Sequence, residues 1–406
     1  YLILLLALWR VKAVACPLNP KLPLETLKGV LDILKPDLMI LDKKCKDIPL
    51  RQAFLDDMVL IEAVEGFFAS ASGREEQIDL EQDAAVILTS GSSGAFKPAL
   101  LSYGNFYTNA LGAHELIPFG RGDSWLLSLP LYHVSGLSII FRALVAGGTV
   151  ILPQGIGLAD EIGRSRPTHI SLIPTQLLGL LNDPFMVELL RGMKCILIGG
   201  ASIPPLLIER SVELGLPVFL TYGLTETASQ VATGKVREGA RILSGREVQL
   251  SPAGDILVRG AVLFKGYLEK NGLRDPRNAD GWFATGDIGE IKDGVLSVTG
   301  RQDSMFISGG ENIVPEAIEK ELLGHPSVAE AVVCPKEDER FGQVPVAFVR
   351  LKEGEDLAPD GLKSFLRMKL LPFQIPKEFY YLPEDLVGRL KASRKELRRS
   401  ARDLQM

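Results

Sequence analysis

Residues 89–97 hold the densest group of side chains suited to binding phosphate. The segment reads Thr-Ser-Gly-Ser-Ser-Gly-Ala-Phe-Lys and follows an apolar, strand-like run at 84–88. Glycines let the backbone approach an anion with positive φ, and successive N–H groups form a concavity for phosphate. Each charge-assisted hydrogen bond contributes roughly 1.5–3 kcal/mol. A flexible serine–glycine linker is the alternative. The residues expected at phosphate are Thr89, Ser90, Gly91, Ser92, Ser93, Gly94 and Lys97.

Further chemistry-bearing residues follow other apolar runs. In open α/β sheets ligands bind beyond the carboxyl ends of the strands, so these residues are candidates for one site. The first is a loop histidine, for which a structural role is the alternative. The second is a glycine turn that suits a flat ring, and the third combines an aromatic face with hydroxyls and a carboxylate. The residues concerned are His133; Gly199, Gly200 and Ala201; and Tyr222, Gly223, Thr225 and Glu226.

Three later motifs extend the candidate site. Asp287, in a Thr-Gly-Asp segment, offers a carboxylate suited to a ribose diol. Arg301 and Asp303 lie where the character of the sequence changes. Ser308, Gly309 and Gly310 form a glycine turn ahead of a helix-like stretch.

The apolar runs determine the expected fold class. Between about residues 30 and 220, near-continuous hydrophobic segments of strand length alternate with helix-like stretches such as 204–214. Continuous apolar runs are typical of strands buried on both faces, as in parallel sheets covered by helices. The pattern predicts an α/β protein with layered, mainly parallel sheets. The strand-like runs lie at 38–41, 84–88, 125–129, 149–152, 169–173, 195–198 and 218–220.

The pattern changes after about residue 240. Short alternating runs separated by glycines predict a small antiparallel, β-barrel-like unit that ends near residue 300. An α+β unit follows, with helix-like stretches at 315–323 and 361–371 and strand-like runs at 328–334 and 344–351. We expect a large N-terminal domain at 1–300, a small mobile C-terminal domain at 301–406, and a hinge near 301–304.

Length and composition favour a cytoplasmic enzyme with several domains. A chain of 406 residues predicts two or three hydrophobic cores. A net charge of −5 gives no electrostatic basis for binding nucleic acid. The seven basic residues between 389 and 402 indicate a solvated amphipathic helix rather than a nucleic-acid surface. Four widely separated cysteines argue against a zinc site or disulfide framework and fit a reducing cytosol.

An apolar run at 1–9 opens the chain. It is too short to span a bilayer, which needs about 20 residues. It also lacks the basic start of a signal peptide, because Arg10 and Lys12 come after the run. We interpret it as a buried helix in a domain whose first residues are missing.

Taken in order, these motifs resemble the adenylate-forming superfamily of acyl-CoA synthetases, peptide-synthetase adenylation domains and luciferases. The resemblance covers essentially the whole chain. Residues 89–97 are similar to the superfamily motif T-S-G-[ST]-T-G-x-P-K, with Ser93 in place of threonine and Phe96 in place of proline. Lys97 keeps its place.

Four segments narrow the resemblance to one family of acid–CoA ligases, those that act on o-succinylbenzoate in menaquinone biosynthesis. The fourth reads Gly-Arg-Leu-Lys-Ala-Ser-Arg and is similar to the family's G-x-x-K-x-S-R. It makes Lys391 the catalytic lysine, whereas relatives with adjacent Gly-Lys would place Arg389 there. Compared with such enzymes, roughly 60–70 N-terminal residues are missing, which fits an incomplete first domain. The segments lie at 116–120, 125–136, 174–177 and 388–394.

The resemblance implies a two-step reaction, in which an acid and ATP form an acyl-adenylate and CoA then displaces AMP. Lys391 would bridge the α-phosphate and the acid, while Mg²⁺ would bind Glu226 and Thr225 would hold phosphates. The C-terminal domain would turn about Asp303 between the steps. The other implied roles are adenine contacts by Gly199, Gly200, Ala201, Tyr222 and Gly223, ribose contacts by Asp287 and Arg301, an acyl-pocket gate at His133, and a pantetheine tunnel lined by Ser308, Gly309 and Gly310.

Two other readings stay open at this point. One is a different aryl- or fatty-acyl-CoA synthetase, because the shared motifs do not fix the acid. The other is a paralogue that binds nucleotide without turnover. Arg142 is either a ligand for a second substrate carboxylate or a surface arginine. The expected partners are a small carboxylic acid, ATP and CoA, with neither nucleic acid nor a membrane span, and a homo-oligomer is compatible with the sequence.

Overall fold

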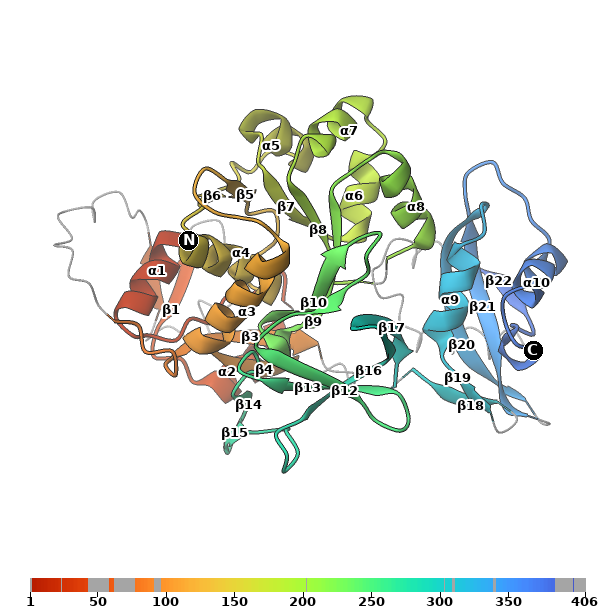
Figure 1. Ribbon diagram of the computed structural model, residues 1–406. Coiled ribbons are helices and arrows are strands. Elements are labelled where there is room, and N and C mark those ends of the chain that lie inside the picture. The colour runs from red at the N-terminus through yellow and green to blue at the C-terminus, as the bar shows by residue number, and fades with distance from the viewer. Residues whose placement is uncertain are drawn as a thin grey trace.

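A computed structural model provides the fold (Figure 1). The residues that it describes are 2–22, 24–42, 58–61, 77–90, 96–201, 203–302, 304–308, 311–338, 341–383 and Leu397. In Figure 1 the large N-terminal part occupies the left and centre, and the C-terminal part from β18 onward lies at the right.

Five parallel strands form the centre of the large part, in the spatial order β6-β5-β7-β8-β9. Every residue of β7 and β8 is buried, which explains why their sequences are nearly continuous hydrophobic runs. The predicted α/β class is therefore confirmed. The strands are β5 (Ser124–Leu126), β6 (Thr149–Ile151), β7 (His169–Leu172), β8 (Cys195–Ile198) and β9 (Val218–Leu224).

The same sheet continues as antiparallel strands beyond β9, giving eleven strands in all. The antiparallel strands predicted near 240–300 are present, but they do not form a separate unit. Strands β10 and β11 pair in between and connect them to the parallel strands in one sheet. Across this junction, Asp287 of β16 contacts Tyr222 of β9. The added strands are β10 (Ser229–Lys235), β11 (Arg241–Ile242), β12 (Arg246–Leu250), β13 (Asp255–Gly260), β16 (Phe283–Lys292) and β17 (Val295–Arg301).

A separate antiparallel sheet of order β15-β14-β4-β3 contains the run predicted at 84–88. Within the large N-terminal part, parallel pairing among the described strands is thus confined to β5–β9 and to the short pair β1–β2. The prediction of mainly parallel layers overestimated the extent of parallel pairing, because an apolar run does not reveal the direction of the strand that pairs with it. The strands are β1 (Met39–Asp42), β2 (Met58–Ile61), β3 (Asp83–Ser90), β4 (Phe96–Ser102), β14 (Gly266–Glu269) and β15 (Gly272–Arg274).

Helices cover these sheets and complete the core. The expected N-terminal helix is α1, which buries Leu5 and Trp9, and the Trp9 indole donates to the carbonyl of Ala84 at 2.9 Å. No helix within the described ranges is long and apolar enough to cross a membrane. The helices are α1 (Leu2–Arg10), α2 (Leu24–Leu34), α3 (Tyr103–Leu116), α4 (Val134–Ala146), α5 (Leu158–Ser165), α6 (Pro174–Leu180), α7 (Pro184–Arg191) and α8 (Pro205–Glu213).

The C-terminal part has its own core. Helices α9 (Pro315–Leu323) and α10 (Pro359–Arg367) pack on one face of the sheet, where Ile318, Leu322 and Leu366 are fully buried. Leu397 lies with Cys334 in the cluster on the other face. The strands are β18 (Phe306–Ser308), β19 (Glu311–Ile313), β20 (Val328–Asp338), β21 (Gly342–Leu351) and β22 (Phe379–Tyr381).

Candidate nucleotide site

The stem of the predicted phosphate loop is a β-hairpin. Strands β3 and β4 pair so that Thr89 lies opposite Lys97, and the Thr89 hydroxyl donates to the Lys97 carbonyl at 3.3 Å. Gly91, Ser92, Ser93 and Gly94 lie outside the described residues, as does the side chain of Ser90. The hairpin therefore brings the two ends of the loop together, and both leave the sheet at the same end of the paired strands.

A cluster of polar groups lies beside this stem. Strand β14 pairs with β4, which places Tyr267 opposite Ala99. The Tyr267 hydroxyl donates to Oε1 of Glu226 at 2.7 Å, and the Lys97 ammonium lies 5.5 Å from the centre of the Tyr267 ring. Glu226 is only 8% exposed. Lys97 and Glu226, predicted as phosphate and metal ligands from distant motifs, are thus neighbours of one tyrosine.

A second cluster surrounds Asp287. The Tyr222 hydroxyl donates to Oδ2 of Asp287 at 2.7 Å, and Arg301 donates to Oδ1 at 2.8 Å. Asp287 is 8% exposed, while the Arg301 side chain is about half exposed. The buried carboxylate is held by two donors, and its strand partner Arg301 lies at the outer side of the site.

Residues 222–226 connect the two clusters. They form the end of β9 and the 3₁₀ turn Thr225–Thr227. Tyr222 belongs to the Asp287 cluster and Glu226 to the Lys97 cluster, while Thr225 lies half-buried between them. Gly223 is required here, because a Cβ on it would lie 1.5 Å from the carbonyl oxygen of Ser229 on β10. One short segment therefore contributes a side chain to each of the two clusters.

The glycine turn at the end of β8 lies next to this segment. Strands β8 and β9 are parallel with Ile198 opposite Leu220, so Gly199 and Gly200 follow Ile198 beside Thr221. A Cβ on Gly199 would lie 2.5 Å from the Thr221 methyl, and Gly200 has φ of 79°. The backbone is thus close-packed up to Gly200, and Ala201 is exposed. A flat ring could lie against this turn.

His133 caps the N-terminus of α4 without a side-chain capping bond. Its ring lies 4.7 Å from that of Tyr132 and lines a small hollow that Leu88 and Phe96 of the phosphate hairpin also line. Partial burial lowers the pKa of His133. The histidine therefore lies near the phosphate hairpin, and its burial favours the neutral form of the ring.

The two site tyrosines stay protonated across the physiological range. Burial, followed by the charge of Asp287, raises the pKa of Tyr222. Burial, followed by the charge of Glu226, raises the pKa of Tyr267. Both hydroxyls are consequently permanent hydrogen-bond donors to their carboxylates.

The motifs of the C-terminal part are only partly described. Ser308 is buried in the hairpin β18–β19, opposite Glu311. Gly309, Gly310, Asp303, Arg389 and Lys391 lie outside the described residues. Ser304, next to the predicted hinge, donates to Glu316 in the first turn of α9 at 2.6 Å.

Sequence reasoning missed Tyr267 and left Arg142 undecided. Tyr267 sits in a short strand with no motif of its own, so nothing nearby marks it as a partner of Glu226. Arg142 is 2% exposed, which rules out the surface interpretation. It donates to Oε1 of Gln230 at 2.7 Å and its guanidinium lies 5.0 Å from the Trp125 ring centre.

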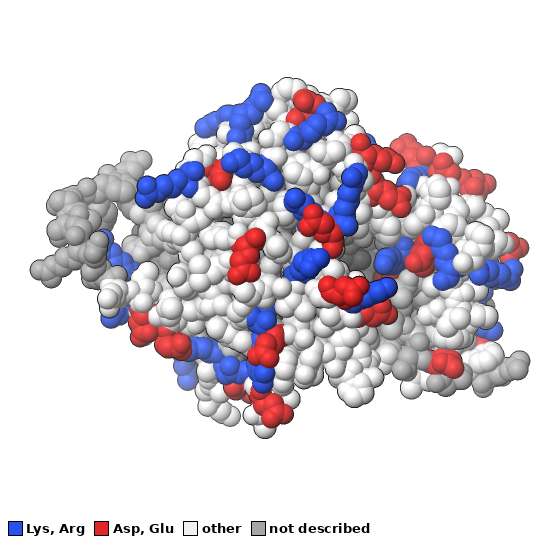
Figure 2. Space-filling model, in the orientation of Figure 1, with Lys and Arg blue, Asp and Glu red and all other residues white. Residues whose placement is uncertain are grey.

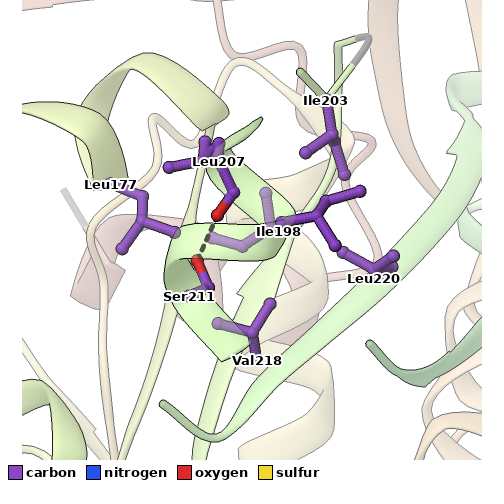
Figure 3. Close-up of a pocket in the computed structure, with 8 residues that line it drawn as sticks. Leu177, Ile198, Ile203, Leu207, Ser211, Val218 and Leu220 are labelled. Atoms are coloured by element: carbon purple, nitrogen blue, oxygen red, sulfur yellow. Dashed lines mark hydrogen bonds between the residues drawn. The ribbon is translucent and has the colours of Figure 1, made fainter. Parts of the chain in front are cut away.

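An apolar hollow near the glycine turn is not the nucleotide site. It lies between α6, α8, the end of β8 and the first residues of β9 (Figure 3). Its lining is aliphatic apart from Ser211, whose hydroxyl donates to the Leu207 carbonyl at 2.7 Å. The described residues that line it therefore offer little to orient a nucleotide. Charges of both signs alternate over the face in Figure 2, without a broad basic area.

The fold and these clusters define a class: α/β proteins that bind a nucleotide at the carboxyl ends of parallel strands. The chain belongs to the AMP-binding enzyme family, whose model matches residues 1–268. The model of the AMP-binding enzyme C-terminal domain matches residues 317–388. The resemblance to adenylate-forming enzymes is confirmed.

Similar proteins cover most of the chain. The 2-succinylbenzoate–CoA ligase of Escherichia coli is 36% identical over 397 residues, 97% of this chain and 83% of that protein. The Bacillus subtilis ligase is 34% identical over 349 residues, 81% and 70% of the two chains. The structure of the B. subtilis synthetase with ATP and magnesium ion is 29% identical with a TM-score of 0.79, covering 93% of this chain and 82% of that one.

Proposed function

We propose that this protein is an AMP-forming acid–CoA ligase that converts 2-succinylbenzoate, ATP and CoA to the CoA thioester through an acyl-adenylate. The observation that carries the proposal is the convergence of the phosphate hairpin and Asp287 on residues 222–226, where Glu226 contacts Tyr267 beside Lys97 and Tyr222 contacts Asp287. The similarity to 2-succinylbenzoate–CoA ligases over 97% of the chain supports the choice of acid.

In the first half-reaction a carboxylate oxygen of the acid attacks the α-phosphorus of ATP, and pyrophosphate leaves. Asp287 and Arg301 hold the ribose hydroxyls, and the Gly199–Ala201 turn and Tyr222 flank the adenine. Thr225 and residues 89–97 hold the phosphates. Since the acid and the triphosphate repel each other, positive charge from Lys97 and Lys391 lowers the barrier by neutralisation and positioning.

The residues at the phosphate side fit a magnesium ion. Mg²⁺ prefers oxygen ligands and usually takes only one or two protein carboxylates together with substrate phosphates. Glu226 offers one buried carboxylate, and no group of three or more potential ligands occurs in the described part of the chain. When bound, the ion would neutralise phosphate charge. Glu226 would hold it through the oxygen that Tyr267 does not contact.

In the second half-reaction the sulfur of CoA attacks the acyl carbon and AMP leaves. We propose that domain 301–406 turns relative to domain 1–300 about Asp303 between the steps. This movement would withdraw Lys391 and bring Ser308, Gly309 and Gly310 to a pantetheine tunnel. His133 would lie at the acyl pocket and gate access between the steps.

Separate assays of the two half-reactions test this proposal. In Lys391→Ala, adenylation measured by ATP–pyrophosphate exchange should fall by the equivalent of about 3–4 kcal/mol, the scale for losing one preorganised donor. Thioester formation from supplied acyl-adenylate should continue. Equal loss in both halves would contradict domain alternation, and the same pattern in Arg389→Ala instead would move the catalytic position to Arg389.

We further propose that Arg142 recognises the carboxylate that is not activated. A fully buried guanidinium is costly without a counter-charge. Among the described residues no carboxylate pairs with Arg142, whose guanidinium donates to Gln230 and lies over the Trp125 ring. Its desolvation lowers its pKa to about 10, so it stays charged at pH 7. A buried cation of this kind suits an acid with two carboxylates.

The expected result for Arg142→Met is a loss of about 10–100-fold in kcat/KM for 2-succinylbenzoate, on the scale of a hydrogen bond to a charged group. An aryl acid with a single carboxylate should lose much less. Arg191→Met, in an exposed pair with Glu188, is the matched control. Equal losses for both acids would contradict this assignment.

A panel of carboxylic acids distinguishes the remaining alternatives. Preferred turnover of an aryl monocarboxylate or a fatty acid would identify a different CoA synthetase. ATP binding with no AMP released from any acid would identify a paralogue that binds nucleotide without turnover.

We place the reaction in the cytoplasm, in keeping with the dispersed cysteines.

A further inference from the structure

Tyr267 touches both charged groups of the phosphate side. Its hydroxyl donates to Oε1 of Glu226 at 2.7 Å, and its ring centre lies 5.5 Å from the Lys97 ammonium. The Arg274 guanidinium lies 5.1 Å from the same ring. The side chain is 8% exposed, so its contacts are largely shielded from water.

The backbone holds Tyr267 in register with both partners. It faces Ala99 on β4, two residues beyond Lys97 on the same strand. The carbonyl of Glu226 accepts a hydrogen bond at 2.8 Å from the amide of Phe264, three residues before Tyr267. The segment around β14 therefore ties the phosphate hairpin to the turn that carries Glu226.

The hydroxyl also fixes the orientation of the Glu226 carboxylate. A carboxylate that accepts a bond at Oε1 is restrained about its last torsion, which leaves Oε2 as the oxygen presented to a cation. Partners that orient a metal ligand in this way typically change metal affinity by 10–100-fold when they are removed.

We infer that Tyr267 is a positioning residue for the metal–triphosphate complex, which aligns Glu226 through its hydroxyl and Lys97 through its ring. This inference rests on the proposed function and adds to it a residue that touches neither substrate nor metal. Its hydroxyl acts on the metal ligand, and its ring supplies a face on which the lysine packs.

The molecule supplies a matched control. Tyr222 is a second buried tyrosine whose hydroxyl donates to a carboxylate, in this case Asp287 on the ribose side. A phenylalanine at either position keeps the ring and removes one hydrogen bond. The two variants should therefore be equally folded but should differ in which part of the nucleotide they affect.

Calorimetry with a non-hydrolysable ATP analogue, in Mg²⁺ and in EDTA, tests the inference without turnover. The measured quantity is the ratio of the two dissociation constants, which is the gain in affinity due to the metal. Tyr267→Phe should reduce this gain about 10-fold or more, with the EDTA value nearly unchanged. Tyr222→Phe should weaken binding equally in both solutions.

A double variant separates positioning from general destabilisation. In a Glu226→Gln background, Tyr267→Phe should no longer change the gain in affinity due to the metal, because the carboxylate that Tyr267 orients is gone. An unchanged gain in Tyr267→Phe, or equal weakening with and without metal, would overturn the inference. If the wild-type protein shows no metal gain and releases no AMP with any acid, the proposed function itself fails.

Discussion

Asp287 and Glu226 are the two buried carboxylates of the site, and each accepts a hydrogen bond from a tyrosine. In each pair the tyrosine hydroxyl donates to only one of the two carboxylate oxygens. These donors fix the orientation of both carboxylates, and Asp287 is bonded at both oxygens because Arg301 donates to its Oδ1. Each carboxylate also has a cation nearby: Arg301 bonds to Asp287, and Lys97 lies near the ring of the tyrosine that contacts Glu226.

At the ribose side, Asp287→Asn should weaken ATP binding by about 10–100-fold, because hydrogen bonds to an ionised group contribute roughly 1.5–3 kcal/mol. Titration calorimetry would measure the change. Glu247→Gln is the control, since Glu247 forms an exposed pair with Arg259, and such pairs contribute little. A change below twofold in Asp287→Asn would exclude it from the ribose site.

Two elements place these residues. The hairpin β3–β4 holds the ends of the phosphate loop opposite each other, and the close pairing of β9 with β10 directs residues 222–226 toward the site. The pairing of β9 and β10 shifts register between Gln230 and Ala232. Gly223 allows the two backbones to approach at this point.

Gly223→Ala should therefore force β9 and β10 apart. The new Cβ would overlap the Ser229 carbonyl at 1.5 Å, and overpacking of this kind costs about 1–3 kcal/mol. Urea unfolding should show the loss, together with weaker ATP binding. Gly29→Ala is the control, because that position in α2 has no neighbour within 4 Å and alanine should stabilise the helix by up to about 1 kcal/mol. Equal stability of both variants would contradict the packing argument.

For the molecule as a whole, burial lowers the pKa of every histidine. An unfolded chain takes up protons near the ordinary histidine value of 6.5, whereas the folded protein resists protonation to lower pH. Stability is therefore fully present above that pH and is lost as the pH falls through and below it. The four residues are His114, His133, His169 and His325.

The melting temperature should accordingly fall as the pH is lowered from about 7.5 to 5.5. His169 makes the best probe, since it is fully buried and its ring nitrogens contact the Pro118 carbonyl at 2.9 Å and the Thr168 hydroxyl at 2.8 Å. His169→Gln should flatten the pH dependence even if it lowers stability. A melting temperature that rises on acidification would contradict the sign of these pKa changes.

The sequence alone determined the α/β class, the buried strands β7 and β8 and the order of the chemistry-bearing segments. These features follow from local patterns, because continuous apolar runs, glycine turns and hydroxyl-rich loops can be recognised within a few residues of sequence. Tertiary structure decided which strands are neighbours. Tyr267 meets Glu226 across 41 residues and Tyr222 meets Asp287 across 65 residues.

No local pattern predicts these two contacts between residues far apart in the sequence. The contact of Tyr267 with Glu226 depends on the pairing of β14 with β4. The contact of Tyr222 with Asp287 depends on how β16 and β17 join the sheet through β11 and β10. The same reason explains why the antiparallel strands after residue 240 were not expected to extend the parallel sheet. It also explains why the burial of Arg142 could not be predicted. Strand partnership results from the packing of the entire core, in which every run of hydrophobic residues competes for the available edges.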